Sequence, residues 1–259
     1  MNNIFNLITS KYKKDGLLRL ILAAVLRLTG YSKFKSYTYS KQLKKVLQLD
    51  NYGDRFQEIY LKRLWGDGAS SSGYGSTLDA TLAIRGWLIN NIPKLSIKKI
   101  VDAPCGDFFW MKDVISKVEV EYHGYDIVPE LIKSNLDNYS SENVKFSVGD
   151  ICQDQLPECD ILLVRDCLFH LSFNDVSRFL QNIQHVKFKF LVTTNFIVDG
   201  NFINKDIKTG DYRAISLFDS PFNFPENEVK ERICENLDGE FERELLVFQK
   251  TNVPNRLEW

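Results

Sequence analysis

Three aspartates stand where successive apolar segments of the chain end. Asp102 opens the turn Ala-Pro-Cys-Gly-Asp, Asp126 ends the next segment about 20 residues after that turn, and Asp150 follows the third segment. A tight turn that leads straight into a helix lets the backbone at Gly106 approach a ligand closely. Open α/β sheets bind ligands at the carboxyl ends of their strands, where an acid placed like Asp126 accepts hydrogen bonds from ribose hydroxyls. The three acids therefore predict one sheet edge that binds a nucleotide-like ligand.

The first turn lacks the second and third glycines of the dinucleotide fingerprint, which points away from NAD and toward a smaller ligand. At these residues the chain resembles the class I S-adenosylmethionine-dependent methyltransferases. Residues 102–107 match the glycine-rich first motif of that family, with Asp107 and Phe108 in place of its usual second glycine. Asp126 matches the ribose-binding acid, and residues 149–151 match the adenine-contacting loop.

The resemblance covers roughly residues 65–259 and implies S-adenosylmethionine as the cofactor and methyl transfer as the reaction. The motifs at 72–76, 102–111 and 165–171 are also similar to a bacterial subgroup linked to methylation of sugars and other small molecules. The acceptor expected from this likeness is a sugar, a glycan or another small molecule. The residues expected at the cofactor are Ser76, Asp102, Ala103, Cys105, Gly106, Asp107, Trp110, Asp126, Ile127, Gly149, Asp150, Ile151 and Arg165.

A second polar segment, Arg-Asp-Cys-Leu-Phe-His at 165–170, follows the fourth expected strand, where a methyl acceptor must approach. An alcohol acceptor must also lose a proton, which a nearby His or carboxylate accepts. His170 titrates near neutral pH and is the first candidate for this base. Asp166 either orients His170 or serves as the base instead, and Arg165 binds an acidic substrate group or pairs with Asp166. A lone His after an apolar stretch is equally often structural, so both interpretations stay open.

Two loops are expected to contact the acceptor or the cofactor. Residues 65–76 are rich in Gly and Ser, which free the backbone and supply hydroxyl donors and a helix cap. Residues 195–225 form a long aromatic-rich connection, of the kind that often forms a lid. The candidate substrate-binding residues are Tyr74, Asn195, Tyr212 and Arg213. A simple helix-capping loop would explain the composition of residues 65–76 equally well, and ordinary aromatic packing would explain that of residues 195–225.

Asp166 and Asn195 are imaginable metal ligands, but no compact cluster of ligands stands out in the sequence, and no metal is predicted.

Alternating apolar segments and helical windows predict an α/β fold with a parallel sheet between layers of helices. The resemblance implies a Rossmann-like, doubly wound, mostly parallel seven-stranded sheet. Strands are expected near 98–103, 121–126, 144–148, 160–165, 188–194 and 243–250, and helices near 77–89, 108–117, 129–138, 174–184 and 226–236. Residues 242–250 and 256–259 are expected to supply the antiparallel hairpin of this fold.

Residues 1–53 are predicted to form a basic, partly amphipathic helical extension before a methyltransferase domain at 54–259. Residues 1–50 contain ten Lys or Arg against two acids, although the whole chain has a formal net charge of −1. The apolar window at 17–28 is shorter than the roughly 20 residues that span a bilayer and carries two arginines. It is expected to lie peripherally on an anionic membrane surface or to pack on the main domain or a second subunit.

The five cysteines are odd in number and lack Cys-x-x-Cys spacing, which indicates reduced, buried thiols and a cytoplasmic protein. Peripheral contact at the inner face of the membrane is a further option.

The sequence leaves three classes of function open. The first is an O-methyltransferase acting on a glycan or other small molecule. The second is a nucleic-acid methyltransferase tethered by the basic extension, which the overall charge disfavours. The third is a non-catalytic partner subunit that binds S-adenosylmethionine.

Overall fold

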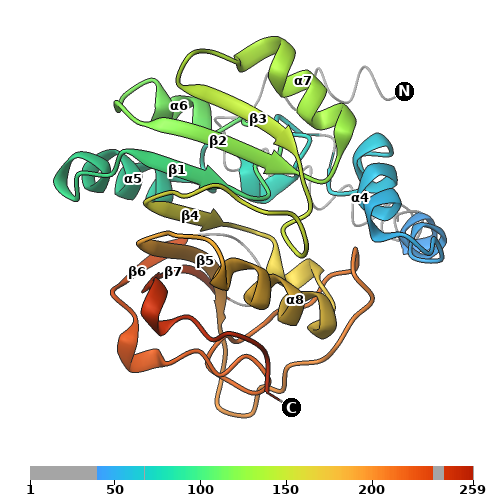
Figure 1. Ribbon diagram of the computed structural model, residues 1–259. Coiled ribbons are helices and arrows are strands. Elements are labelled where there is room, and N and C mark those ends of the chain that lie inside the picture. The colour runs from blue at the N-terminus through green and yellow to red at the C-terminus, as the bar shows by residue number, and fades with distance from the viewer. Residues whose placement is uncertain (1–39, 67, 236–241, 259) are drawn as a thin grey trace, which may run out of the picture. The chain divides into compact units, whose positions relative to one another are not determined.

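A seven-stranded sheet forms the centre of the fold (Figure 1). The computed structural model describes residues 40–66, 68–235 and 242–258, and the described residues from Val46 onward belong to one compact unit. The strand order across the sheet is β3-β2-β1-β4-β5-β7-β6. The strands are β1 (Lys99–Asp102), β2 (Glu121–Asp126), β3 (Val144–Val148), β4 (Ile161–Val164), β5 (Phe190–Ile197), β6 (Glu231–Glu235) and β7 (Glu242–Gln249). The predicted doubly wound, mostly parallel fold is confirmed.

Strands β1 to β5 run parallel, so their carboxyl ends lie along one edge of the sheet. β1 is central, and its last residue, Asp102, pairs with Gly124 of β2 and Leu163 of β4. β7 runs antiparallel to both β5 and β6. The strand order reverses beside β1, and ligands of such sheets bind outside the carboxyl ends at this point.

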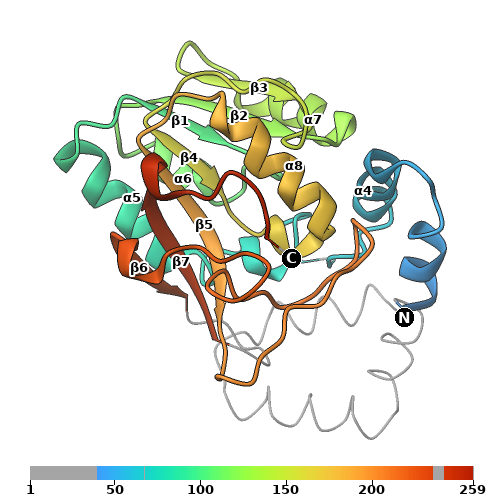
Figure 2. The same cartoon turned by 60° about the horizontal axis from the view of Figure 1, so that its bottom comes forward.

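Helices cover both faces of the sheet and bury one apolar cluster on each. One face carries α5 (Leu82–Lys94), α6 (Met111–Ile115) and α7 (Pro129–Tyr139). The other face carries α8 (Phe173–Gln184), which stands in front of the sheet in Figure 2. Helix α8 begins at its N-cap Ser172, which accepts a hydrogen bond from the Asp175 N–H. The apolar residues of α8 recur with helical spacing and are fully buried: Val176, Phe179, Leu180 and Ile183.

The segment predicted as a helix at 226–236 is instead a short 3-10 helix (Glu226–Glu228) followed by β6. In Glu-Arg-Ile-Cys-Glu the buried residues Ile233 and Glu235 alternate with exposed ones, which is the period of a strand. The antiparallel hairpin is therefore β6 with β7, and residues 256–258 form no strand. Cys234, predicted to be buried, is exposed because it points away from the core on this edge strand.

Helix α4 (Tyr52–Leu61) lies at the edge toward which the parallel strands point (Figure 1). It begins at Asn51, whose side chain accepts a hydrogen bond from the Gly53 N–H, and it packs beside α7. Residues 40–46 are also helical. The apolar window at 17–28, with its expected membrane or subunit contact, lies outside the described residues. Within the described part of the chain, no helix is long and apolar enough to cross a membrane.

Candidate functional site

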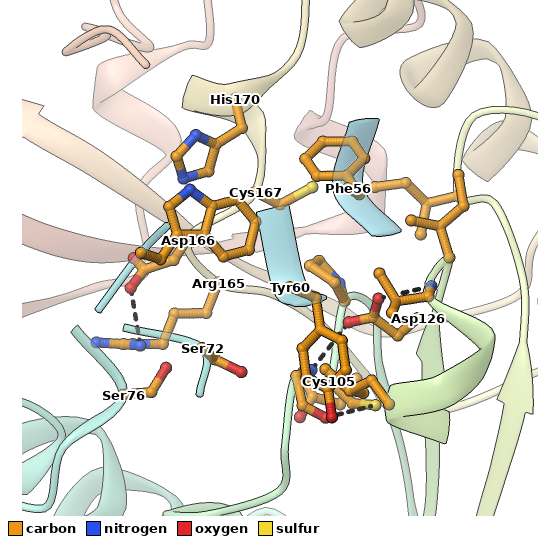
Figure 3. Close-up of a pocket in the computed structure, with 18 of the residues that line it drawn as sticks. Phe56, Tyr60, Ser72, Ser76, Cys105, Asp126, Arg165, Asp166, Cys167 and His170 are labelled. Atoms are coloured by element: carbon orange, nitrogen blue, oxygen red, sulfur yellow. Dashed lines mark hydrogen bonds and ion pairs between the residues drawn. The ribbon is translucent and has the colours of Figure 1, made fainter. Parts of the chain in front are cut away.

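A single pocket at the carboxyl ends of β1 to β4 brings together most of the residues singled out in the sequence. Its volume is about 1020 Å³, open solvent at its mouth included. Figure 3 shows Asp166 and His170 on one side of this pocket, Asp126 and Cys105 toward the other, and Tyr60 between them. The predicted residues that line it are Ser76, Asp102, Cys105, Gly106, Trp110, Asp126, Ile127, Gly149, Asp150, Ile151, Arg165, Asp166 and His170.

The turn after β1 requires glycine for two reasons. Gly106 has a φ of +55°, a left-handed conformation that other residues adopt at a cost. A Cβ at this position would also come within 2.5 Å of the Ser72 hydroxyl oxygen. The backbone N–H of Gly106 donates to Asp126 Oδ2 at 3.1 Å, so the turn and the end of β2 are tied together. The conformation of the turn thus follows from contacts to two other segments.

Asp107 occupies the position of the missing second glycine and holds the serine loop. Its carboxylate accepts hydrogen bonds from the Ser70 hydroxyl at 2.9 Å and from the Ser71 N–H at 2.6 Å. Its own N–H donates to the Ser72 hydroxyl at 3.0 Å. Asp107 does not line the pocket, whereas Ser71, Ser72 and Ser76 do. The loop predicted to cover a ligand is therefore anchored to the glycine turn.

Burial sets the charge state of the two central acids. Asp102 is only 2% exposed, accepts a hydrogen bond from the Tyr122 hydroxyl at 2.7 Å, and has its pKa raised by burial to about 7. Burial likewise raises the pKa of Asp126 to about 6, although the N–H groups of Val128 and Gly106 donate to it. Desolvation disfavours the ionised form of these two carboxylates, and a positively charged ligand beside them would relieve that penalty.

Asp150 is held between the sheet edge and α4. Its Oδ1 accepts a hydrogen bond from the Cys152 N–H at 2.9 Å, and its Oδ2 accepts one from the Tyr52 hydroxyl. Burial and this contact raise the pKa of Tyr52, so the phenol remains protonated and donates. Arg178 of α8 lies beside the same phenol oxygen, at 3.5 Å. The N-terminus of α4 is therefore attached directly to the third of the predicted acids.

Arg165 and Asp166 belong to a buried network of four charged side chains. Arg165 pairs with Asp166 at 3.0 Å and with Glu235 at 2.8 Å, and donates to the Gly75 carbonyl at 2.8 Å. Arg243 pairs with Asp166 at 3.1 Å and with Glu235 at 2.8 Å. Burial by itself raises the pKa of Asp166, but the two guanidinium groups outweigh it and hold this pKa below its usual value. Asp166 is therefore ionised, and it is a poor proton acceptor.

His170 presents one ring nitrogen to the pocket. Its Nδ1 lies 2.7 Å from the backbone carbonyl oxygen of Asp211, which can only accept, so Nδ1 carries the proton and Nε2 keeps its lone pair. Burial lowers the pKa of His170, which favours the neutral ring. The indole of Trp65 stacks on the imidazole with ring centroids 4.9 Å apart. The geometry thus supplies a neutral, oriented imidazole with a hydrogen-bond acceptor at the pocket.

Other predicted residues lie outside the pocket lining. Ala103 is fully buried behind the turn. Asn195 is 1% exposed and donates to Glu244 at 2.9 Å, its partner in the β5–β7 register. Arg213 is buried over the Phe173 ring, its guanidinium nitrogens make no hydrogen bond to any residue that the structure describes, and burial lowers its pKa to about 10. The remaining two, Tyr74 and Tyr212, are exposed.

Four aromatic residues that line the pocket were not singled out from the sequence. Tyr52, Phe56 and Tyr60 come from α4, and Trp65 comes from the segment that follows it. The first three are spaced at i, i+4 and i+8, so they share one face of the helix. That spacing was a readable signal, because a helix with an aromatic stripe must bury the stripe against something.

The described residues contain no obvious set of metal ligands. Within the described ranges, no group of three or more His, Cys, Asp or Glu side chains is arranged to hold a metal ion. Asp166 and Asn195, the two residues considered as ligands, are engaged by arginines and by Glu244 respectively.

Comparison with solved structures places the fold. Human N-acetylserotonin methyltransferase in complex with SAM superposes with a TM-score of 0.52 at 15% identity, over 82% of this chain and 67% of that one. Magnesium protoporphyrin IX methyltransferase from Synechocystis PCC 6803 with bound SAM gives 0.52 at 11% identity, over 77% and 98%. This chain has the fold of the SAM-dependent methyltransferases. PigF with SAH is similar at a TM-score of 0.53 and 11% identity, over 83% and 70%.

Two comparisons of the sequence, with family models and with curated proteins, were also made. No model of a protein family matches the chain. No curated protein matches it either.

Proposed function

We propose that this chain transfers a methyl group from S-adenosylmethionine to a hydroxyl of a small molecule. The observation that carries the proposal is the convergence of Asp102, Asp126 and Asp150 on the pocket that His170 also lines, with the His170 ring held through Nδ1 by the Asp211 carbonyl. The methyltransferase fold and the SAM and SAH present in similar structures support the choice of cofactor.

The pocket residues fit this cofactor chemically. Both oxygens of Asp126 accept a backbone N–H, and the N–H of Ile127 also bonds this carboxylate, which leaves an acceptor position for a ribose hydroxyl. Asp150 offers the same kind of free position to the adenine amine. The described lining contains four acids against one arginine, an excess of negative charge that suits the positive sulfonium and ammonium groups of S-adenosylmethionine.

The reaction needs alignment and the removal of one proton. When bound, the cofactor supplies an electrophilic methyl group. The pocket walls hold the acceptor oxygen in line with it, which is the largest part of such a rate enhancement. His170 accepts the hydroxyl proton at Nε2, while the carbonyl of Asp211 fixes the ring through Nδ1. Asp166, paired with Arg165 and Arg243, stabilises the ring once it is protonated.

The first test is calorimetric titration of the full chain with S-adenosylmethionine and S-adenosylhomocysteine. We expect micromolar binding that is lost in Asp126→Ala and retained in Asp137→Ala, an exposed aspartate of α7. Transfer of a labelled methyl group to a panel of hydroxyl compounds, sugars included, then tests the reaction. Absence of binding would refute the proposal, and binding without transfer to any acceptor would favour a non-catalytic partner subunit.

A further inference from the structure

Aromatic rings surround the end of the pocket that contains His170. Trp65 stacks on the imidazole at 4.9 Å and 28°, and Phe56 lies 6.0 Å from Trp65 in a tilted arrangement. Tyr60 of the same α4 face also lines the pocket. Tilted and stacked rings at these distances are the geometry in which aromatic groups attract one another. A planar aromatic ring of a bound ligand could make the same kind of stacked or tilted contacts with Trp65 and Phe56.

The two charged residues that line this end of the pocket, Arg165 and Asp166, are already engaged by other groups. Nε and Nη2 of Arg165 donate to Glu235 and Gly75, and its Nη1 pairs with Asp166. Asp166 in turn accepts from Arg165 and Arg243. Breaking a buried pair of this kind to bind a charged acceptor group would leave its partner uncompensated, which is strongly unfavourable. The pocket therefore favours an acceptor without a carboxylate or phosphate near its reacting oxygen.

The strength of the base also selects among neutral hydroxyls. Burial lowers the pKa of His170 below its ordinary range, so its neutral ring is a weak base. A phenol hydroxyl ionises near pKa ~10, as in tyrosine, whereas an aliphatic hydroxyl resembles water, whose pKa is about 15.7. A weak, neutral imidazole is much closer to the proton affinity of a phenolate than to that of an alkoxide, so it assists a phenol more effectively.

We propose that the acceptor is a neutral, planar aromatic compound with a hydroxyl on its ring, which lies against Trp65 and Phe56 and donates its hydroxyl proton to Nε2 of His170. This inference rests on the proposed function. In the step itself the hydroxyl oxygen attacks the methyl carbon, and the carbon–sulfur bond breaks with its electron pair left on sulfur. The proton passes to His170 and then to solvent, so the products are an aryl methyl ether, S-adenosylhomocysteine and one proton.

The test compares two probes on the full chain saturated with S-adenosylhomocysteine: 2-naphthol and methyl α-glucoside. We expect calorimetry to show binding of 2-naphthol and no binding of the glucoside. Trp65→Ala and Phe56→Ala should each weaken 2-naphthol binding at least tenfold, while Trp65→Phe should retain most of it. Trp87→Ala is the matched control, because Trp87 lies on α5, donates to Glu231 and does not line the pocket. Circular dichroism and thermal unfolding of every variant show whether its fold is intact.

The outcomes separate this inference from the function on which it rests. If S-adenosylhomocysteine binds but 2-naphthol does not, or if Trp65→Ala and Phe56→Ala leave 2-naphthol binding unchanged, the aromatic acceptor is wrong. Methyl transfer to the glucoside in preference to 2-naphthol would overturn it while supporting the methyltransferase proposal. Failure of S-adenosylmethionine and S-adenosylhomocysteine to bind the wild-type chain would refute both.

Discussion

The two ends of the pocket are built in different ways. At the end defined by Asp126 and Asp150, carboxylates at strand ends are held by backbone N–H groups of neighbouring turns. At the end defined by His170, side chains from distant segments hold one another through ring stacking and ion pairs. Backbone-held groups keep their positions when a single neighbouring side chain changes. The comparison therefore predicts that cofactor binding tolerates changes in α4 and the serine loop better than acceptor chemistry does.

Removal of the base should produce the largest effect. We expect His170→Ala to slow methyl transfer by about 10²- to 10⁴-fold, the usual contribution of general-base catalysis, with cofactor affinity unchanged. Single-turnover transfer of labelled methyl and calorimetry measure the two quantities. His185→Ala, which changes an exposed histidine after α8, is the control. Equal losses of binding and transfer would mean that His170 supports the cofactor end as well.

The pH dependence of the wild-type activity should also reflect His170. Because the neutral ring of His170 is the active form and burial lowers the pKa of this ring, activity should fall only as the pH drops below about 6.5.

The carboxylate of Asp102 should lower the stability of the ligand-free chain at high pH. Its folded-state pKa of about 7 lies above 3.8, the ordinary pKa of an aspartate, so the stability that its protonated form contributes is lost as the pH rises through 7. We expect Asp102→Asn to raise the free energy of unfolding above pH 7 by on the order of 2–4 kcal/mol, and to weaken cofactor binding. Urea denaturation at pH 5 and pH 8 measures the first effect. A stability gain equal at both values would show that desolvation of the charge is not its cause.

Gly106→Ala tests the connection between the two ends. The left-handed backbone should cost about 1–2 kcal/mol, and the new Cβ meets the Ser72 hydroxyl. We expect cofactor affinity to fall at least tenfold and to recover in part when Ser72→Gly removes the clash. Gly86→Ala, at an open position inside α5, should leave affinity unchanged and stabilise the chain slightly. If the double variant recovers nothing, the conformation of the turn alone decides the affinity.

Tyr52→Phe should have the smallest effect. It removes the hydrogen bond from α4 to Asp150, and we expect a loss of about 1 kcal/mol in stability with less than a threefold change in cofactor affinity. Thermal unfolding and calorimetry measure both. A tenfold loss of affinity would contradict the proposed difference between the two ends and make α4 part of the cofactor site.

Local patterns were sufficient to predict most of the sheet. The parallel strands were recognised because fully buried strands are short apolar runs bounded by turn residues, as in Ile161–Val164. The helix predicted at 226–236 was wrong because charged residues surround a single apolar position, and only pairing with β7 reveals the alternation of Ile233 and Glu235. The position of Asn195 inside the sheet depends on the pairing of β5 with β7, which places Glu244 opposite Asn195.

Local sequence was enough to predict the alternation of strands and helices, the glycine turn at Gly106 and the positions of Asp102, Asp126 and Asp150 at strand ends. Each of these follows from neighbouring residues, because hydrophobic period and turn chemistry are local properties. Three features appear only in the folded chain: Asp107 holds the serine loop, two arginines pair with Asp166, and the aromatic face of α4 lines the pocket. These depend on contacts between segments far apart in the chain, and no local pattern encodes which partners will meet.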